Sequence, residues 1–324
     1  MIARCSQLSR HACFLALACW ILSGCGGEGV TGPKEKEPPV VDRHAAIPAG
    51  AVKASPASDL FPPVLHSTEF DEPVPMPVIN TAGGEDAPFI PAGRAEMYFF
   101  FGAVLEEDPS IAIRDPVNGI WVSKKMGGIW QEPTLVWLQG YDELALNGCP
   151  VVDGNEMFFC TARAGYSGLQ WFKADYIGGA WGNWGPAEVP PEYDVGEFHI
   201  HGDELYYGSD RPGGQGGQDL WMLTRVGDVW ANPMNVIAVN TPGDETRPYV
   251  TPDGGELWFT LGYQGTPAVV RSTRVAGQWQ EPELIVSQFA GEPTLDASGN
   301  LYFVHHFYEN GEMQDADIYV AYRK

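Results

Sequence analysis

The chain has 324 residues and a formal net charge of −23, with 42 acidic residues against 19 basic ones. This balance argues against binding to nucleic acid and against adsorption to anionic lipid headgroups, because both targets are negatively charged. It fits a soluble domain outside the cytoplasm.

The first 24 residues are predicted to be a signal peptide. Arg4 and Arg10 form a basic start, and the apolar run that ends at Leu22 is too short to span a bilayer as a mature helix. The sequence Leu22-Ser-Gly-Cys25 resembles a bacterial lipobox. That resemblance implies cleavage before Cys25 and lipidation of its sulfur, and Gly26 at the next position favours the outer membrane. An ordinary secretory signal with a chance cysteine is the alternative.

Residues 25–60 are predicted to form a flexible tether. They contain Pro33, Pro38-Pro39 and a charged run from Lys34 to Glu37, and such a segment cannot bury enough apolar surface to fold. The folded domain is therefore expected to comprise residues 61–324. No other stretch is apolar enough to cross a membrane, so the protein is expected to be anchored rather than membrane-spanning.

A Trp-x-x-Pro phrase returns about every fifty residues along the rest of the chain, which is typical of a repeat fold. The phrase begins at Trp130, Trp230 and Trp279, and a longer variant begins at Trp181. Around each copy, four short strands rich in aromatic and β-branched residues are separated by Gly and Asp turns. These units predict an all-β fold, a five-bladed β-propeller of four-stranded blades. The repeated tryptophans are expected to pack between blades.

The N-terminal part of the domain is predicted to close the ring. The fifth unit reaches the end of the sequence at Lys324 before a fourth strand can follow. Phe70-Asp-Glu-Pro73 matches the phrase Trp279-Gln-Glu-Pro282 and is the displaced copy. A strand from this segment would complete the last blade and remove a free sheet edge.

Three motifs resemble the WD-like repeats of TolB-type propellers. They are the glycine-rich run from Gly208 to Trp221, Asn240-Thr-Pro-Gly-Asp-Glu245, and Pro248-Tyr-Val-Thr-Pro-Asp-Gly254. The resemblance is strongest over residues 200–300 and continues over 70–324. It implies a propeller of the bacterial cell envelope, but no reaction, since one fold hosts many functions. TolB itself has six such blades, so a count of five departs from it.

Two cysteines follow the tether, Cys149 and Cys160. They flank the hairpin signal Asp153-Gly-Asn155, so they are expected to face each other on adjacent strands. In an oxidising compartment a cross-strand disulfide is predicted. Two thiols without a neighbouring histidine do not indicate a zinc site, and no metal site is predicted. Oxygen ligands of the acidic loops leave Ca²⁺ as an alternative.

Antiparallel strand order sorts the connecting loops onto two faces. Short turns share one face, while the longer loops, which lead into the first strands and join the second to the third, share the other, the loop-rich face. A site is expected there, around the central axis. The candidate binding residues come from four blades: Glu85, Asp86, Glu197, His199, Arg247, Tyr249 and Glu292.

Two interpretations of these residues remain open. Glu85, Glu245 and Glu292 recur near the inner-strand prolines, which favours a role in capping backbone amides, whereas Glu197 and His199 break that pattern. The preferred hypothesis is a non-catalytic propeller that binds a glycan, a peptide or another envelope protein. The alternative is a glycoside hydrolase or lyase that uses carboxylates around the axis, with Glu197, Glu245 and Glu292 as catalytic candidates.

Overall fold

The structure is a computed structural model that describes residues 38–105, 108–163, 170–189 and 196–324. The predicted signal peptide, Cys25 and the first part of the predicted tether lie outside the described residues. Within the described residues, no helix is long and apolar enough to cross a bilayer.

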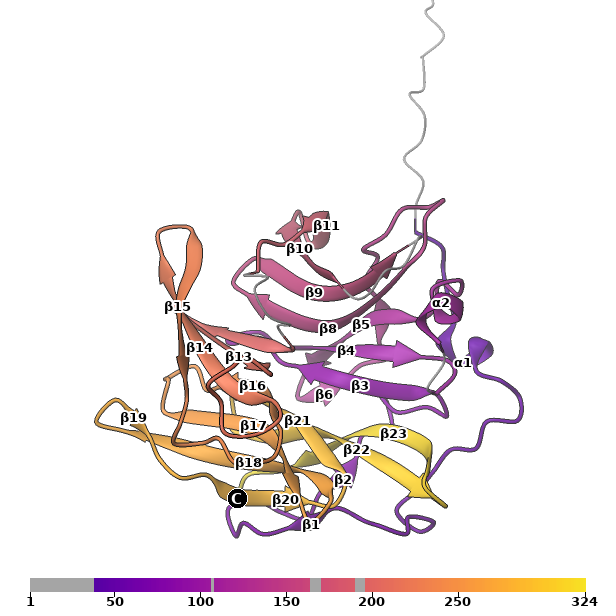
Figure 1. Ribbon diagram of the computed structural model, residues 1–324. Helices are drawn as coiled ribbons and strands as arrows, with labels where there is room; N and C mark the ends of the chain where they lie inside the picture. The colour runs from indigo at the N-terminus through magenta and orange to yellow at the C-terminus, as the bar shows by residue number, and fades with distance from the viewer. Residues whose placement is uncertain (1–37, 106–107, 164–169, 190–195) are drawn as a thin grey trace, which may run out of the picture. The chain divides into compact units, whose positions relative to one another are not determined.

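Five antiparallel sheets make up the fold (Figure 1). The first three blades contain β3 (Gly84–Phe89), β4 (Glu96–Gly102), β5 (Gly119–Met126), β6 (Ile129–Trp130) and β7 (Thr134–Leu135); β8 (Ala145–Asp153), β9 (Glu156–Arg163), β10 (Gln170–Ile177) and β11 (Ala180–Pro186); and β12 (Phe198–His201), β13 (Glu204–Ser209), β14 (Asp219–Val226) and β15 (Val229–Asn235).

The last two blades contain β16 (Glu245–Val250), β17 (Glu256–Tyr263), β18 (Thr266–Val275), β19 (Gln278–Trp279), β20 (Glu283–Ser287) and β1 (Val64–Leu65); and β21 (Ala290–Leu295), β22 (Leu301–Glu309), β23 (Glu312–Ala321) and β2 (Val74–Pro75). The first strands contact one another in a closed cycle, from β3 through β8, β12, β16 and β21 back to β3. This cycle confirms the predicted all-β, five-bladed propeller.

The fourth strand is interrupted in blades one and four, although the Trp-x-x-Pro phrase is shared. In blade one, β6 and β7 flank Pro133, and in blade four, β19 and β20 flank Pro282. Proline has no backbone N–H to donate to the ladder, so the strand breaks there and resumes with the same partner. In blades two and three, β11 and β15 continue through a register shift instead.

The predicted ring closure is confirmed. Strand β2 pairs with β23 through Val74↔Val320 and Pro75↔Tyr319, and Phe70 forms an isolated bridge with Arg323. The Phe70 ring is fully buried and packs edge-on against Trp258 of blade four, with 6.1 Å between ring centroids.

Residues 38–60 differ from the predicted flexible tether, because they pack against the propeller. Arg43, in the short helix α1 (Arg43–Ala46), is only 2% exposed, and Lys53 forms an ion pair with Asp317 of blade five. Asp59 contacts His305 at 2.8 Å, with both side chains buried. Charged side chains with buried partners hold this segment, so the packed chain begins well before residue 61. Next to it, β1 adds a strand to blade four beside β20.

The repeated tryptophans pack between blades, as predicted. Trp130, Trp181 and Trp279 each lie edge-on against a tyrosine in the second strand of the preceding blade. In each pair the indole N–H donates to the tyrosine hydroxyl, at 3.2–3.3 Å. The tyrosines are Tyr302, Tyr98 and Tyr206, respectively.

Candidate functional site

The first strand of four blades carries a bulge close to the axis. In each, the pairing register shifts, the bulged residue has a left-handed backbone, and proline follows. A left-handed backbone costs a non-glycine residue about 1–3 kcal/mol, and such strain is concentrated at functional sites. The bulged residues are Ala87 (φ 49°), Cys149 (φ 50°), Arg247 (φ 54°) and Glu292 (φ 59°).

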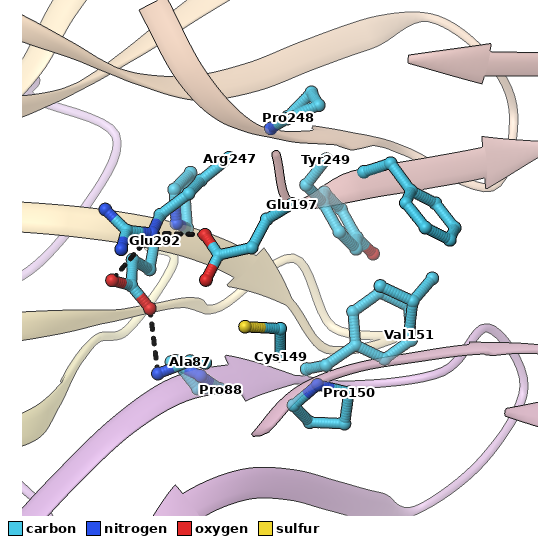
Figure 2. A pocket seen from close by; sticks show the side chains of 13 residues that line it. Ala87, Pro88, Cys149, Pro150, Val151, Glu197, Arg247, Pro248, Tyr249 and Glu292 are labelled. Atoms are coloured by element: carbon cyan, nitrogen blue, oxygen red, sulfur yellow. Dashed lines mark hydrogen bonds and ion pairs between the residues drawn. The ribbon is translucent and has the colours of Figure 1, made fainter. Parts of the chain in front are cut away.

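These four residues, together with Glu197 at the corresponding position of blade three, form what we call the axial ring. All five line one pocket of about 50 Å³ (Figure 2). Figure 2 shows the carboxylates of Glu197 and Glu292 directed toward Arg247, and the sulfur of Cys149 directed toward the same space. Bulges re-aim side chains, and here they bring one side chain from each of four blades to the axis, where Glu197 of blade three joins them without a bulge.

Arg247 connects the two carboxylates of the axial ring. Its Nε lies 2.8 Å from Glu292 Oε1 and also forms an ion pair with Glu197. Glu292 Oε2 accepts a hydrogen bond of 2.8 Å from the Ala87 amide of the neighbouring blade. Burial alone would lower the pKa of Arg247, but the carboxylates of Glu197 and Glu292 raise it. The guanidinium is therefore charged at any physiological pH.

Asp86 and Glu292 form an unequal carboxyl pair beside the ring. Burial raises the pKa of Glu292 well above its ordinary value, and Asp86 and Glu197 add to this effect against Arg247. Burial would also raise the pKa of Asp86, but His306 and Arg247, with a hydrogen bond to Glu292, hold it below its ordinary value. The pKa values of the two neighbouring carboxyls are therefore shifted in opposite directions, upward for Glu292 and downward for Asp86.

An aromatic layer of Phe89, His199 and Tyr249 lies next to the axial ring, and Phe89 and Tyr249 line its pocket. His199 packs against Tyr249 at 4.8 Å and against Phe89 at 5.7 Å between ring centroids. Burial lowers the pKa of His199 to about 3, so its imidazole is neutral. The Tyr249 hydroxyl donates to the Leu295 carbonyl at 3.2 Å. Of the two residues expected to bind ligand here, Tyr249 lines the axial pocket, whereas His199 packs behind it and lines no part of that pocket.

A second hollow lies on the other side of this layer. It has a volume of about 290 Å³ and is lined by His199, His201, Tyr249 and the turn glycines Gly154 and Gly202. The sequence predicts a site on the loop-rich face, but the larger of these two axial hollows lies on the face of the short turns.

Glu85 and Glu245 do not belong to the axial site. Glu85 accepts hydrogen bonds from the amide and hydroxyl of Thr81, at 2.8 and 2.6 Å, and Glu245 repeats this with Thr241, at 3.0 and 2.5 Å. Both precede the bulge by two residues, and both carboxylates are buried in their own loops. The capping interpretation holds for this pair, and Glu245 does not join Glu197 and Glu292 as a catalytic candidate.

Sequence reasoning missed Cys149 and His306 as neighbours of the site. Cys149 is found by aligning the residues that precede the proline of each first strand. His306 is found on β22, the strand that pairs with the first strand of blade five. Cys149 and Cys160 are free thiols with 2.6 Å between their sulfurs. In the part of the chain that the structure describes, no three His, Cys, Asp or Glu side chains are grouped to hold a metal ion.

Comparison with known proteins gives likenesses of fold. No family model matches the sequence, and no curated protein matches it. Solved structures with a similar fold include TolB from Acinetobacter baumannii (11% identity, TM-score 0.44, 75% of this chain and 56% of that one) and an α-L-arabinofuranosidase from Lactobacillus brevis (12%, 0.46, 76% and 91%). An exo-β-1,3-galactanase from Phanerochaete chrysosporium is similar over 81% of this chain and 64% of its own (12%, 0.44).

This chain thus spans about half the length of TolB. Likenesses at these identities concern the fold and transfer no activity to this chain.

Proposed function

We propose that this chain is an extracytoplasmic β-propeller that binds an envelope protein, a peptide or a glycan through its loop-rich face without catalysing a reaction. The observation that carries the proposal is the ion-paired axial ring. Arg247 lies between the two ring carboxylates, so neither is left free to act on a substrate.

The size of the axial pocket supports the same proposal. Pockets that enclose a drug-sized ligand have volumes of about 300–1,000 Å³, whereas the axial pocket has about 50 Å³. Glycosidases also place the substrate between their two carboxyls, and here a guanidinium occupies that position. The unequal pair of Asp86 and Glu292 is the one feature that a hydrolase would share, so the test addresses it directly.

The envelope location belongs to the proposal as well. It is supported by the lipobox-like sequence that ends at Cys25 and by the acidic charge of the chain. We infer a lipid anchor at Cys25, on the outer membrane, with residues 61–324 as the propeller and the preceding residues connecting it to the anchor.

Catalysis is tested by incubating the protein with a panel of plant, fungal and bacterial polysaccharides and measuring released reducing ends. We expect none. Turnover that is lost in folded Glu197→Gln or Glu292→Gln variants would overturn the non-catalytic proposal.

The binding face is tested by crosslinking in the native host. A photo-reactive amino acid replaces Tyr141, in a loop of the loop-rich face, or Ile177, at an exposed hairpin tip of the opposite face. We expect crosslinked products from position 141 only. Products from position 177 alone would place the partner on the wrong face for this proposal.

A further inference from the structure

A buried arginine occupies a defined pocket on the outer side of blade one. Arg43 donates to the carbonyls of Ile79 (2.5 Å) and Val78 (2.9 Å) and to the Glu132 carboxylate (2.9 Å). Its guanidinium lies 6.0 Å from the ring centres of Phe101 and of Trp121. Glu85 completes this acidic environment, 3.5 Å from Nη1. Two carbonyls, two carboxylates and an apolar floor thus hold one cation.

Blade four repeats the framework of this pocket. The loop that leads into β16 is held by the same hydrogen bonds as the loop that leads into β3. The side-chain amide of Asn240 accepts from the Leu220 N–H and donates to the Leu220 carbonyl, and Asn80 does the same with Ile318. Thr241 binds Glu245 as Thr81 binds Glu85.

The lining residues of the two pockets correspond position by position. The cross-strand partners Glu85↔Phe101 and Trp121↔Leu135 of blade one become Glu245↔Leu261 and Val270↔Leu284 in blade four. The acid of the Trp-x-x-Pro phrase, Glu132 in blade one, becomes Glu281. The remaining lining residues correspond as follows: Val78 to Ala238, Ile79 to Val239, and Pro133 to Pro282.

The blade-four pocket contains no cation of its own. It has an open volume of about 520 Å³, and none of its lining residues is an arginine or a lysine. Leu261 and Val270 stand where Phe101 and Trp121 form the floor in blade one, which makes the hollow wider. The blade-four pocket therefore has residues that correspond to the hydrogen-bond acceptors of the first pocket, but no guanidinium that donates to them.

In the other three blades a cationic side chain lies in the corresponding region, from the blade itself in blades two and three and from the N-terminal segment in blade five. In blade two the guanidinium of Arg163 lies 4.4 Å from the Phe172 ring, and in blade three that of Arg211 lies 5.6 Å from the Trp221 ring. Both rings occupy the position of Trp121 in the pairing register. In blade five, Lys53 reaches Asp317 on the corresponding face. Blade four has Tyr263 where blades two and three have these arginines.

We propose that the blade-four pocket binds the arginine side chain of a partner polypeptide, held by Glu281 and the carbonyls of Ala238 and Val239. The chemistry is that of Arg43 in blade one, and the acidic charge of the chain favours a cationic segment. This site lies away from the axial ring, so its test is independent of the function proposed there.

The proposal is tested with a fluorescent peptide of residues 38–48, which carries Arg43 in its natural context, and with the same peptide containing citrulline in place of arginine. Citrulline keeps the shape but removes the charge. We expect the arginine peptide to bind the full chain and the citrulline peptide to bind at least about tenfold more weakly. Equal affinities, or no binding up to about 1 mM, would overturn the proposal.

Variants of the protein locate the binding. Glu281→Gln is expected to weaken the arginine peptide about tenfold, whereas Glu312→Gln, an equal charge change at an exposed position of blade five, leaves it unchanged. Tyr263→Arg fills the pocket as in blades two and three, and we expect it to abolish binding without lowering the melting temperature. Binding that is sensitive to Glu132→Gln but not to Glu281→Gln would indicate exchange into blade one and contradict the proposal.

Discussion

At Arg247, one guanidinium neutralises carboxylates from two other blades. Glu197 comes from blade three and Glu292 from blade five, so the contact ties three blades at the axis. Its side chain is 38% exposed, and solvent screening therefore reduces what each ion pair contributes.

The Arg247→Leu variant is expected to unfold more easily, by about 1–3 kcal/mol, because it leaves adjacent carboxylates without a counter-charge. Urea denaturation measures this change. The double variant Arg247→Leu/Glu292→Leu is the control, and it should recover much of the loss. A double variant no more stable than the single one would show that charge repulsion is not the cause.

His199 makes the stability of the fold depend on pH. The unfolded chain protonates this imidazole near its ordinary pKa of 6.5, whereas the folded protein does so only near 3. The unfolded state therefore binds more protons between these values, and the free energy of unfolding falls as pH drops from about 6.5 to 3. His199→Phe is expected to flatten this part of the profile, measured by melting temperature against pH.

His44→Phe is the matched control, because it makes the same substitution at an exposed histidine. If both variants changed the slope equally, the buried imidazole would not be its source.

At this scale the sequence predicted residue types better than their roles. Glu197, Arg247 and Glu292 meet at the axis, as the repeat pattern indicated. Glu245 does not meet them, because a bulge between Thr246 and Tyr249 shifts the pairing and separates Glu245 from Arg247. Arginine has no particular preference for the left-handed backbone conformation that Arg247 adopts, so the local sequence does not predict this bulge. Only Pro248, the next residue, indicates where it lies.

At the scale of elements, the tryptophan–tyrosine contacts join one blade to the next. The Trp279→Phe variant keeps the aromatic packing on Tyr206 but loses the indole N–H donor. We expect it to lower the free energy of unfolding by about 1 kcal/mol more than Trp230→Phe does. Trp230 is the control because Phe158 of blade two occupies the position of the tyrosine that pairs with the other tryptophans. Phe158 has no hydroxyl to accept a hydrogen bond from the indole N–H. Chemical denaturation of the two variants compares them, and equal losses would contradict the hydrogen-bond contribution.

The hairpin of β8 and β9 carries the two cysteines of the predicted disulfide, Cys149 and Cys160, as free thiols. Its sulfurs lie 2.6 Å apart, so little movement separates the thiols from a bond. An oxidoreductase disulfide can oxidise the two thiols by accepting two electrons and two protons, which reduces it to a dithiol. We expect this protein to lose the mass of two hydrogen atoms in that reaction. Intact-mass spectrometry detects this, and the oxidised form should be about 2–3 kcal/mol more stable than the reduced one. Two persistently free thiols after export would contradict the prediction.

At the scale of the whole molecule, ring closure rests on the pairing of β2 with β23. A variant without residues 62–80 is expected to expose the edge of β23 and to aggregate, as measured by size-exclusion chromatography with light scattering. A variant without residues 1–61 keeps the closing strand and should remain monomeric, with a lower melting temperature. Monomeric and equally stable behaviour of the first variant would refute the closure.

The blade count and the closing strand could be predicted because a fifty-residue repeat imposes them on every copy. The packing of residues 38–60 could not, because it depends on single charged residues. Arg43, Lys53 and Asp59 each find a buried partner that is distant in sequence, and a composition rich in proline and charge conceals this.

The order of these contacts along the chain has a mechanical consequence. If a membrane anchor pulls on the N-terminus, tension reaches Arg43 first, then Lys53 and Asp59, and then the pairing of β1 with β20. Only after these contacts break does the load reach β2, the strand that closes the ring. Under such a load, the contacts of residues 43–65 would break before the ring opens.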